Sequence, residues 1–299
     1  MPFVLSRAVL AGLAFVLLGC PERGARAAAA SADDFGVPVR SGTTTDPARI
    51  VSLNPTTTDL LFAIGAGPRV VGRTHWDSWS DSVREVADLG PGLRPNIEAV
   101  LGARPDLVVL YASADNAAAA RQLRAAGVDV ISLKVDRLAD FRRATLLLGT
   151  ATGETGRARS VVDSVTRTLE RVRAATRDLP HPTVFWHIWD APIITIGRGS
   201  YMNELVEIAG GRNVYGDVAA PSPTVSIEDV IRRDPDVIIA GPLGAAHLRE
   251  SATWRTVGAV RRGRIVVVDT MLVGRPSARL GEAAAAIAQL LHPDARGLP

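Results

Sequence analysis

The chain contains the same segment twice, and this duplication limits the folds available to it. The segment from Asn96 to Val109 (NIEAVLGARPDLVV) matches the segment from Ser226 to Ile239 (SIEDVIRRDPDVII). In each copy a capping residue precedes Ile-Glu, a short amphipathic helix, Pro-Asp and a β-branched run typical of a buried strand. A second pair, Asp59 to Gly67 and Asn203 to Gly211, repeats at a different offset. The change of offset indicates an old domain duplication, so we expect two similar lobes with a cleft between them.

Strand and helix patterns alternate in both halves, which predicts an α/β fold with one parallel sheet in each lobe. The first lobe is expected over residues 48–152 and the second over residues 180–293. Between them, residues 154–177 have apolar side chains at helical spacing, with no Gly or Pro after Gly156. We therefore predict one long α-helix within residues 153–179 that joins the lobes and permits only modest lobe movement. Shorter helices are predicted at 56–64, 97–101, 115–126, 138–150 and 201–209.

Composition argues against nucleic-acid binding. The net charge is only +3, and the cations are nearly all arginines scattered among carboxylates, with Lys134 the only lysine. A nucleic-acid-binding surface needs a basic stripe, which this pattern does not form. The 47% hydrophobic and 22% charged residues are instead typical of a globular body.

The N-terminus has the pattern of a processed leader. Arg7 precedes an apolar run from Ala8 to Leu18, too short for a bilayer span of about 20 residues. The Leu-Leu-Gly-Cys that follows resembles the bacterial lipoprotein signal, in which the cysteine is lipidated. Cys20 is the only cysteine, so we expect it to hold the lipid after removal of residues 1–19. Residues 20–47 lack periodicity and are predicted to be a flexible tether.

Aromatic residues gather at the predicted carboxyl ends of the strands, where open parallel sheets bind ligands. Four of the five tryptophans lie in two such segments, around Trp76 and around Trp189. Aromatic faces offer large contact area at little entropic cost, which suits a flat, partly apolar ligand such as a corrin or haem. For Trp186 the alternative is packing in the hydrophobic core, because this residue lies on a predicted strand. The predicted ligand-binding residues of these segments are Pro55, Thr56, Thr57, His75, Trp76, Tyr111 and Trp189.

The sequence contains little that supports an enzymatic function. The chain has neither a G-x-S-x-G elbow nor an H-E-x-x-H motif, and its single cysteine is assigned to the lipid. The segment from Gly197 to Ser200 lies between a strand and a helix, where a tight turn and an anion site are alternatives. We expect no enzyme activity, no catalytic residue and no cofactor.

A metal ion is a second alternative. A zinc or manganese site needs about four converging ligands. His75, Asp77 and His187 could begin such a set, but the first lobe offers no second histidine. One imidazole suffices as an axial ligand of haem iron, so His75 or His187 could take that role. We predict no site for a bare metal ion.

The order of these segments resembles one known family, the class III periplasmic binding proteins of ABC importers, in the group that binds cobalamin and ferric siderophores. The resemblance covers Arg49 to Leu291. It implies two Rossmann-like lobes joined by a rigid helix, with the ligand cleft between the lobes. It rests on RIVSLNPTTTDLLFAIGAGPRVVG, the two copies of the duplicated segment, the long helix, NELVEIAGGRNVY and RPSARL.

The resemblance also implies roles for single residues. In the family a glutamate on each lobe meets arginines of the permease, and the duplication places this role on Glu98 and Glu228. The helix dipole alone would also favour a carboxylate at both positions. Arg275, the first residue of RPSARL, matches a cleft arginine of the cobalamin binders. Ser222 stands where the family often has an aromatic residue, which weakens cobalamin relative to other large chelates.

The function implied is that of an extracytoplasmic lipoprotein, in the periplasm or at the cell surface. We expect a monomer that captures cobalamin or a related corrinoid and delivers it to an ABC permease with its ATPase. The alternative is a haem- or ferric-siderophore-binding protein of the same fold, followed by a zinc- or manganese-binding protein.

Overall fold

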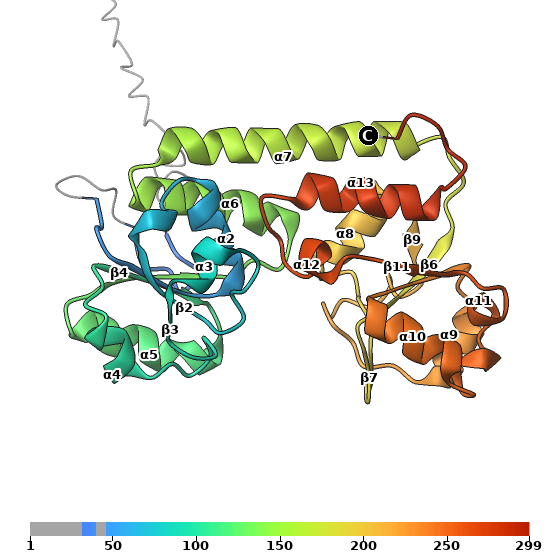
Figure 1. The fold of residues 1–299 in the computed structure, drawn as a ribbon, viewed down its shortest axis with the longest axis horizontal. Coiled ribbons are helices and arrows are strands. Elements are labelled where there is room, and N and C mark those ends of the chain that lie inside the picture. The colour runs from blue at the N-terminus through green and yellow to red at the C-terminus, as the bar shows by residue number, and fades with distance from the viewer. Residues whose placement is uncertain (1–31, 40–45, 299) are drawn as a thin grey trace, which may run out of the picture.

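A computed structural model describes residues 32–39 and 46–298, which form two α/β lobes side by side (Figure 1). The first lobe has a five-stranded parallel sheet in the order β3-β2-β1-β4-β5, and the second a four-stranded parallel sheet in the order β11-β10-β6-β9. The predicted fold class is confirmed. The strands are β1 (Ile50–Leu53), β2 (Val70–Arg73), β3 (Ala87–Asp88), β4 (Leu107–Tyr111), β5 (Asp129–Leu133), β6 (Thr183–His187), β9 (Arg212–Asn213), β10 (Val237–Ala240) and β11 (Ile265–Val267), with an antiparallel hairpin of β7 (Trp189–Asp190) and β8 (Ile193–Ile194).

Helices cover both faces of each sheet, so the central strands are apolar on both sides. Ile50 of β1 packs in the core shared with α2, α6 and α7, whereas its neighbour Val51 packs in the core under α4 and α5. This alternation follows from the two-residue period of a strand. The helices are α2 (Pro55–Ala63), α3 (Asp81–Arg84), α4 (Ile97–Gly102), α5 (Ala114–Ala125), α6 (Leu138–Ala151), α7 (Thr155–Thr176), α8 (Tyr201–Ile208), α9 (Ile227–Arg233), α10 (Pro242–Glu250), α11 (Gly258–Arg261), α12 (Thr270–Val273) and α13 (Leu280–Leu291), with single 3-10 turns η1 (Gly67–Arg69) and η2 (Trp254–Thr256).

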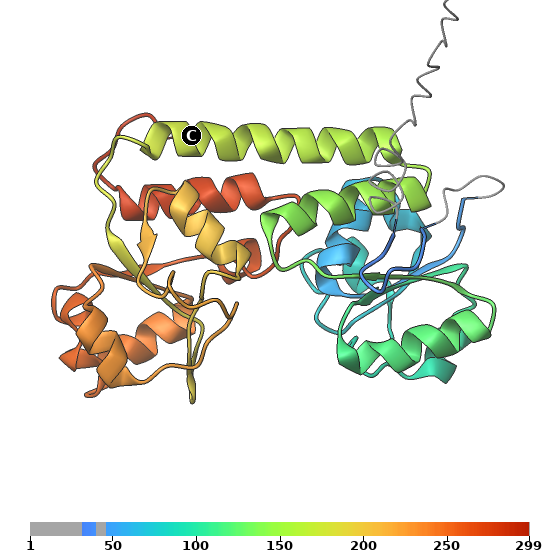
Figure 2. The ribbon, with the colours of Figure 1, turned by 180° about the vertical axis from the view of Figure 1, so that it is seen from behind.

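Helix α7 is the predicted linking helix and lies across α6 of the first lobe and α13 of the second, as both views show (Figures 1 and 2). Glycines allow the close approach at each contact. A Cβ on Gly149 of α6 would lie 2.4 Å from the Cβ of Ala158, and one on Gly281 of α13 would lie 2.7 Å from Thr168. The helix is therefore packed tightly onto both lobes.

A polar contact also joins the lobes beneath α7. Glu204 of α8 accepts hydrogen bonds from the backbone N–H of Leu138 at 2.7 Å and from Nε of Arg137 at 2.9 Å. Leu138 is the first residue of α6, so a carboxylate of the second lobe binds the N-terminus of a first-lobe helix.

The segment 32–39 corrects part of the predicted tether. Asp33 is buried and accepts hydrogen bonds from the backbone N–H of Ser132 in the edge strand β5 and from Arg124. Asp34 accepts from the backbone N–H of Lys134 at 2.6 Å. These bonds outweigh the lack of sequence periodicity and hold the segment against the first lobe.

The predicted leader and Cys20 lie outside the described residues. Among the residues that the structure describes, no helix is long and apolar enough to cross a membrane.

Candidate functional site

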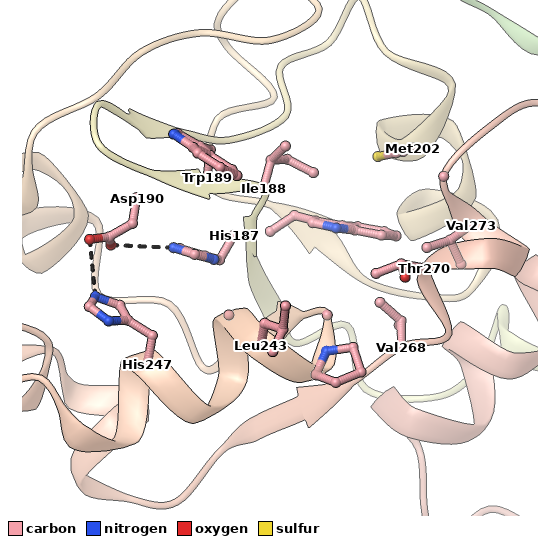
Figure 3. Close-up of a pocket in the computed structure, with 15 residues that line it drawn as sticks. His187, Ile188, Trp189, Asp190, Met202, Leu243, His247, Val268, Thr270 and Val273 are labelled. Carbon is pink, nitrogen blue, oxygen red and sulfur yellow. Dashed lines mark hydrogen bonds and ion pairs between the residues drawn. The ribbon is translucent and has the colours of Figure 1, made fainter. Parts of the chain in front are cut away.

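A pocket of about 530 Å³ opens at the carboxyl ends of β6, β10 and β11, and every residue that lines it belongs to the second lobe (Figure 3). Large apolar side chains stand at its rim: Leu243 is 89% exposed and Trp189 is 61% exposed. Apolar groups this exposed and this close together mark a binding surface. The main apolar lining residues are Trp186, Ile188, Trp189, Met202, Leu243 and Val273.

Segments that follow strands supply the walls of this pocket. Pro242 starts α10 directly after β10, a position that tolerates proline because its missing N–H has no helical partner. The next residue, Leu243, lies in the first turn and is not part of the lobe core. After β11, the side chain of Asp269 caps α12 by accepting from the backbone N–H of Met271 at 2.8 Å. The start of α10 is thus set by its proline, and the start of α12 by its aspartate cap.

One end of the pocket is polar. Asp190 lies between two histidines, 3.4 Å from Nε2 of His187 and 3.0 Å from Nε2 of His247 (Figure 3). Burial lowers the pKa of His187, although the hydrogen bond to Asp190 acts in the opposite direction. His187 is therefore a neutral imidazole at pH 7. The pocket offers an apolar wall and one hydrogen-bonding edge.

The first lobe presents a separate aromatic residue. Trp76 is 63% exposed and packs edge-on against His75, with 4.3 Å between the ring centroids. Trp76 follows β2, so it lies at the carboxyl edge of its sheet, as Trp189 does in the other lobe. Neither Trp76 nor His75 lines the pocket of the second lobe.

The structure places two predicted ligand contacts inside the first lobe. Thr57 has no exposed surface, and its hydroxyl donates to the backbone carbonyl of Asn54 at 3.0 Å and lies 2.9 Å from the hydroxyl of Ser52. Thr56 is also buried, at 7% exposure. Neither threonine lines the apolar pocket of the second lobe, and their assignment as ligand contacts stays a prediction. Pro55, at the first position of α2, is half-buried.

Tyr111 is half-buried at the end of β4. Its hydroxyl donates to Asp136 at 2.9 Å. Burial, followed by this hydrogen bond, raises the pKa of Tyr111. The residue is therefore a neutral phenol whose donor is already occupied.

Arg275 lies between the lobes. Its Nε is 3.7 Å from the carboxylate of Asp59 in α2, and its guanidinium stacks over the ring of Trp79 at 4.1 Å from the centroid. Burial raises the pKa of Asp59 despite the opposing hydrogen bond from the backbone of Ala278 and the charge of Arg275. These three side chains line a second, more polar cavity of about 410 Å³. Arg275 thus contacts the first lobe and does not line the apolar pocket.

Glu98 and Glu228 occupy equivalent positions. Each is exposed in the first turn of its helix, α4 or α9, behind a side-chain cap from Asn96 or Ser226. Both helices lie on the side of their lobes away from α7 (Figure 1). The helix N-terminus and the Ser226 hydroxyl lower the pKa of Glu228. Each lobe therefore carries one exposed carboxylate at the start of a short helix.

Several lining residues were not expected from the sequence, among them Leu243, His247 and Met202. Leu243 lies three residues after the end of β10, so the rule that ligands bind beyond the carboxyl ends of strands would have found it. His247 is one turn further along α10. Met202 belongs to a helix that carried no ligand signal, and only the packing of α8 brings it to the pocket.

Comparison with known proteins agrees with this architecture. The family model described as periplasmic binding protein matches residues 50–271. An uncharacterized ABC transporter substrate-binding lipoprotein of Bacillus subtilis is 28% identical over 257 residues, which cover 83% of this chain and 81% of that protein. A cobalamin-binding protein of Halobacterium salinarum is 28% identical over 261 residues, which cover 83% of this chain and 70% of that protein.

Solved structures show the same fold. The periplasmic vitamin B12-binding protein of Vibrio cholerae superposes with a TM-score of 0.74 at 22% identity, covering 84% of this chain and 99% of the other. A periplasmic haem-binding protein from Roseiflexus sp. RS-1 also has a TM-score of 0.74, at 24% identity, covering 83% of this chain and 99% of the other. Likeness at these identities establishes the fold alone. Because the family model matches well over half of its residues, the chain belongs to the periplasmic binding protein family.

Proposed function

We propose that this protein is the substrate-binding component of an ABC importer and that it captures cobalamin or a related corrinoid. The observation that supports this most is the exposure of Trp189 and Leu243 at one apolar pocket, together with exposed Trp76 on the first lobe. Relatives named for ABC transporter substrate binding and for cobalamin binding point the same way.

The chemistry of the pocket favours a large, flat ligand. Covering an exposed indole and a leucine with apolar surface contributes about 25 cal/mol for each Å² removed from water. A small hydrophilic ion would leave those side chains in water. Haem or a ferric siderophore is the alternative, because the same aromatic wall and hydrogen-bonding edge suit either. The lower alternative is a zinc- or manganese-binding protein. Among the described residues, no group of three or more His, Cys, Asp or Glu side chains could hold a metal ion.

Delivery requires that the permease loosens the complex. Glu98 and Glu228 supply one carboxylate on each lobe for arginines of the permease, and engagement of both lobes together biases the cleft toward its open state. A lipid on Cys20 would keep the protein, as a monomer outside the cytoplasm, near its permease. No covalent step is part of this function.

A tryptophan-fluorescence titration tests the ligand. The chain from Pro21 onward is titrated with cyanocobalamin, haemin and a ferric hydroxamate, with correction for absorption by the ligand. Saturable quenching by one probe at micromolar or lower concentration is expected, and Trp189→Ala should weaken it at least tenfold. Ile231→Ala, which removes an exposed apolar side chain from α9, is the matched control. If none of the three probes quenched the fluorescence, the proposed ligand class would be contradicted.

Docking is tested separately, in proteoliposomes that contain the cognate permease. The double variant Glu98→Ala, Glu228→Ala should bind ligand normally but lose stimulation of the ATPase. Glu170→Ala, an exposed glutamate of α7 on the opposite side, should behave as the wild type. Normal transport by the double variant would show that these glutamates do not dock.

A further inference from the structure

The hairpin that holds Trp189 has little structure of its own. Strands β7 and β8 are two residues each, and an isolated two-stranded hairpin is marginal in water. The β8 side is tied to the neighbouring loop, where the backbone N–H of Val225 donates to the carbonyl of Ile193 at 3.0 Å. The β7 side, which forms the wall of the pocket, is tied by the side chain of Asp190.

The carboxylate of Asp190 contacts three elements, through hydrogen bonds with Trp254 and His187 and an ion pair with His247. Nε1 of Trp254 in η2 donates at 2.8 Å, Nε2 of His247 in α10 lies at 3.0 Å, and Nε2 of His187 in β6 lies at 3.4 Å (Figure 3). Trp254 is only 2% exposed and packs against Phe185 in the core, so its N–H is a rigid anchor. The carboxylate thus joins the hairpin to three rigid parts of the lobe.

The charge state of Asp190 suits a residue that joins the hairpin to the rest of the lobe. Burial by itself raises the pKa of Asp190, but the hydrogen bonds from Trp254 and His187 and the charge of His247 outweigh it and lower the pKa. The group is a carboxylate at pH 7 and can only accept hydrogen bonds. The hydrogen bond with His187 therefore requires that this imidazole donate from Nε2.

We propose that Asp190 is a positioning residue for the ligand: it clamps the β7–β8 hairpin onto α10 and η2 and so holds Trp189 in place at the pocket. This inference rests on the proposed function, because it assigns Asp190 to the binding of the same apolar ligand. A side chain that is already ordered loses less conformational freedom when the ligand arrives. Without the contacts of Asp190, binding of the ligand would have to order the β7–β8 hairpin. The affinity would then be lower, because the ligand would dissociate faster.

The first test needs no ligand. Acrylamide quenching is measured for the full-length protein and for its Asp190→Ala variant, each paired with a Trp189→Phe counterpart so that the difference reports Trp189. We expect Trp189 to become clearly more accessible to acrylamide in Asp190→Ala. Asp178→Ala, an exposed aspartate at the end of α7, should leave it unchanged. Equal quenching in Asp190→Ala and wild type would overturn the clamp.

The second test measures binding of cyanocobalamin and haemin. Asp190→Ala should bind the recognised probe about tenfold more weakly, a loss of about 1.4 kcal/mol. Asp190→Asn should recover most of that affinity, since its amide oxygen still accepts from Trp254. If Asp190→Ala fails to fold, His247→Ala, which removes the half-exposed ion-pair partner of Asp190, should make Trp189 more accessible to acrylamide in the first test and weaken binding about threefold at unchanged melting temperature. Unchanged affinity in these variants would overturn the inference, whereas wild type that binds neither probe would count against the proposed ligand.

Discussion

Replacement of Glu204 by alanine should show how much the contact between the lobes contributes to stability. Three hydrogen bonds are lost: from the backbone of Leu138 at 2.7 Å and from Nε and a terminal nitrogen of Arg137 at 2.9 and 2.5 Å. The Arg137 side chain is 44% exposed, so its pairing counts as a surface ion pair of about 0.2–1 kcal/mol. The backbone bond at the helix N-terminus is worth about 1 kcal/mol. We expect a loss of about 1.2–2 kcal/mol.

Urea denaturation followed by circular dichroism measures this loss, and the melting temperature should fall by about 2–4 °C for each kcal/mol. Glu207→Ala is the matched control, because Glu207 is an exposed residue of the same helix whose carboxylate bonds only to Asn203. It should cost less than about 0.5 kcal/mol. If Glu204→Ala were no less stable than Glu207→Ala, the contact would not stabilise the arrangement of the lobes and this reasoning would be refuted.

Three further perturbations test single parts of the fold. Burial raises the pKa of Asp77 above 3.8, so the folded state binds the proton more tightly and wild-type stability should fall as pH rises through that raised pKa. Asp77→Asn should make this slope in urea midpoints from pH 3 to 7 shallower, leaving the contribution of Asp59, whose pKa burial also raises; a slope equal to that of the wild type would disprove the prediction. Gly92→Ala should cost about 2 kcal/mol or more in the same assay, because φ is +84° and a Cβ would lie 2.5 Å from a carbonyl oxygen of β1. A Cβ at Gly90 would meet no atom within 4 Å, so Gly90→Ala should lower the free energy of unfolding by less. An equal loss in the two variants would show that the contact with β1 is unimportant. Asp33→Ala removes buried hydrogen bonds worth about 1–3 kcal/mol and should speed amide hydrogen exchange in residues 33–39 about fivefold or more. Unchanged exchange would mean that other contacts hold the segment.

Local patterns predicted the elements well. The linking helix was expected over 154–177 and is observed over Thr155–Thr176, because apolar spacing and the absence of glycine and proline are properties of the chain itself. The helical starts after Asn96 and Ser226 were predicted for the same reason, since a cap bonds to an N–H two or three residues away.

The candidate site was predicted less completely. The strand-end rule located Trp76 and Trp189, both of which are exposed. It also selected Thr57, whose hydroxyl donates to the backbone carbonyl of Asn54, a contact that sequence position alone does not reveal. Arg275 was expected in the ligand site, and the structure shows it paired with Asp59 across the lobes.

The sequence by itself determined the duplication, the alternation of strands and helices, the linking helix and the aromatic segments, since each is a pattern within a short stretch of chain. Only the tertiary structure decided which side chains share a pocket, that Asp190 binds Trp254 and that Glu204 binds the start of α6. These contacts join residues more than sixty positions apart in the chain. They depend on how whole elements pack, and hydrophobic periodicity places a residue on a face of its element without naming the residue opposite.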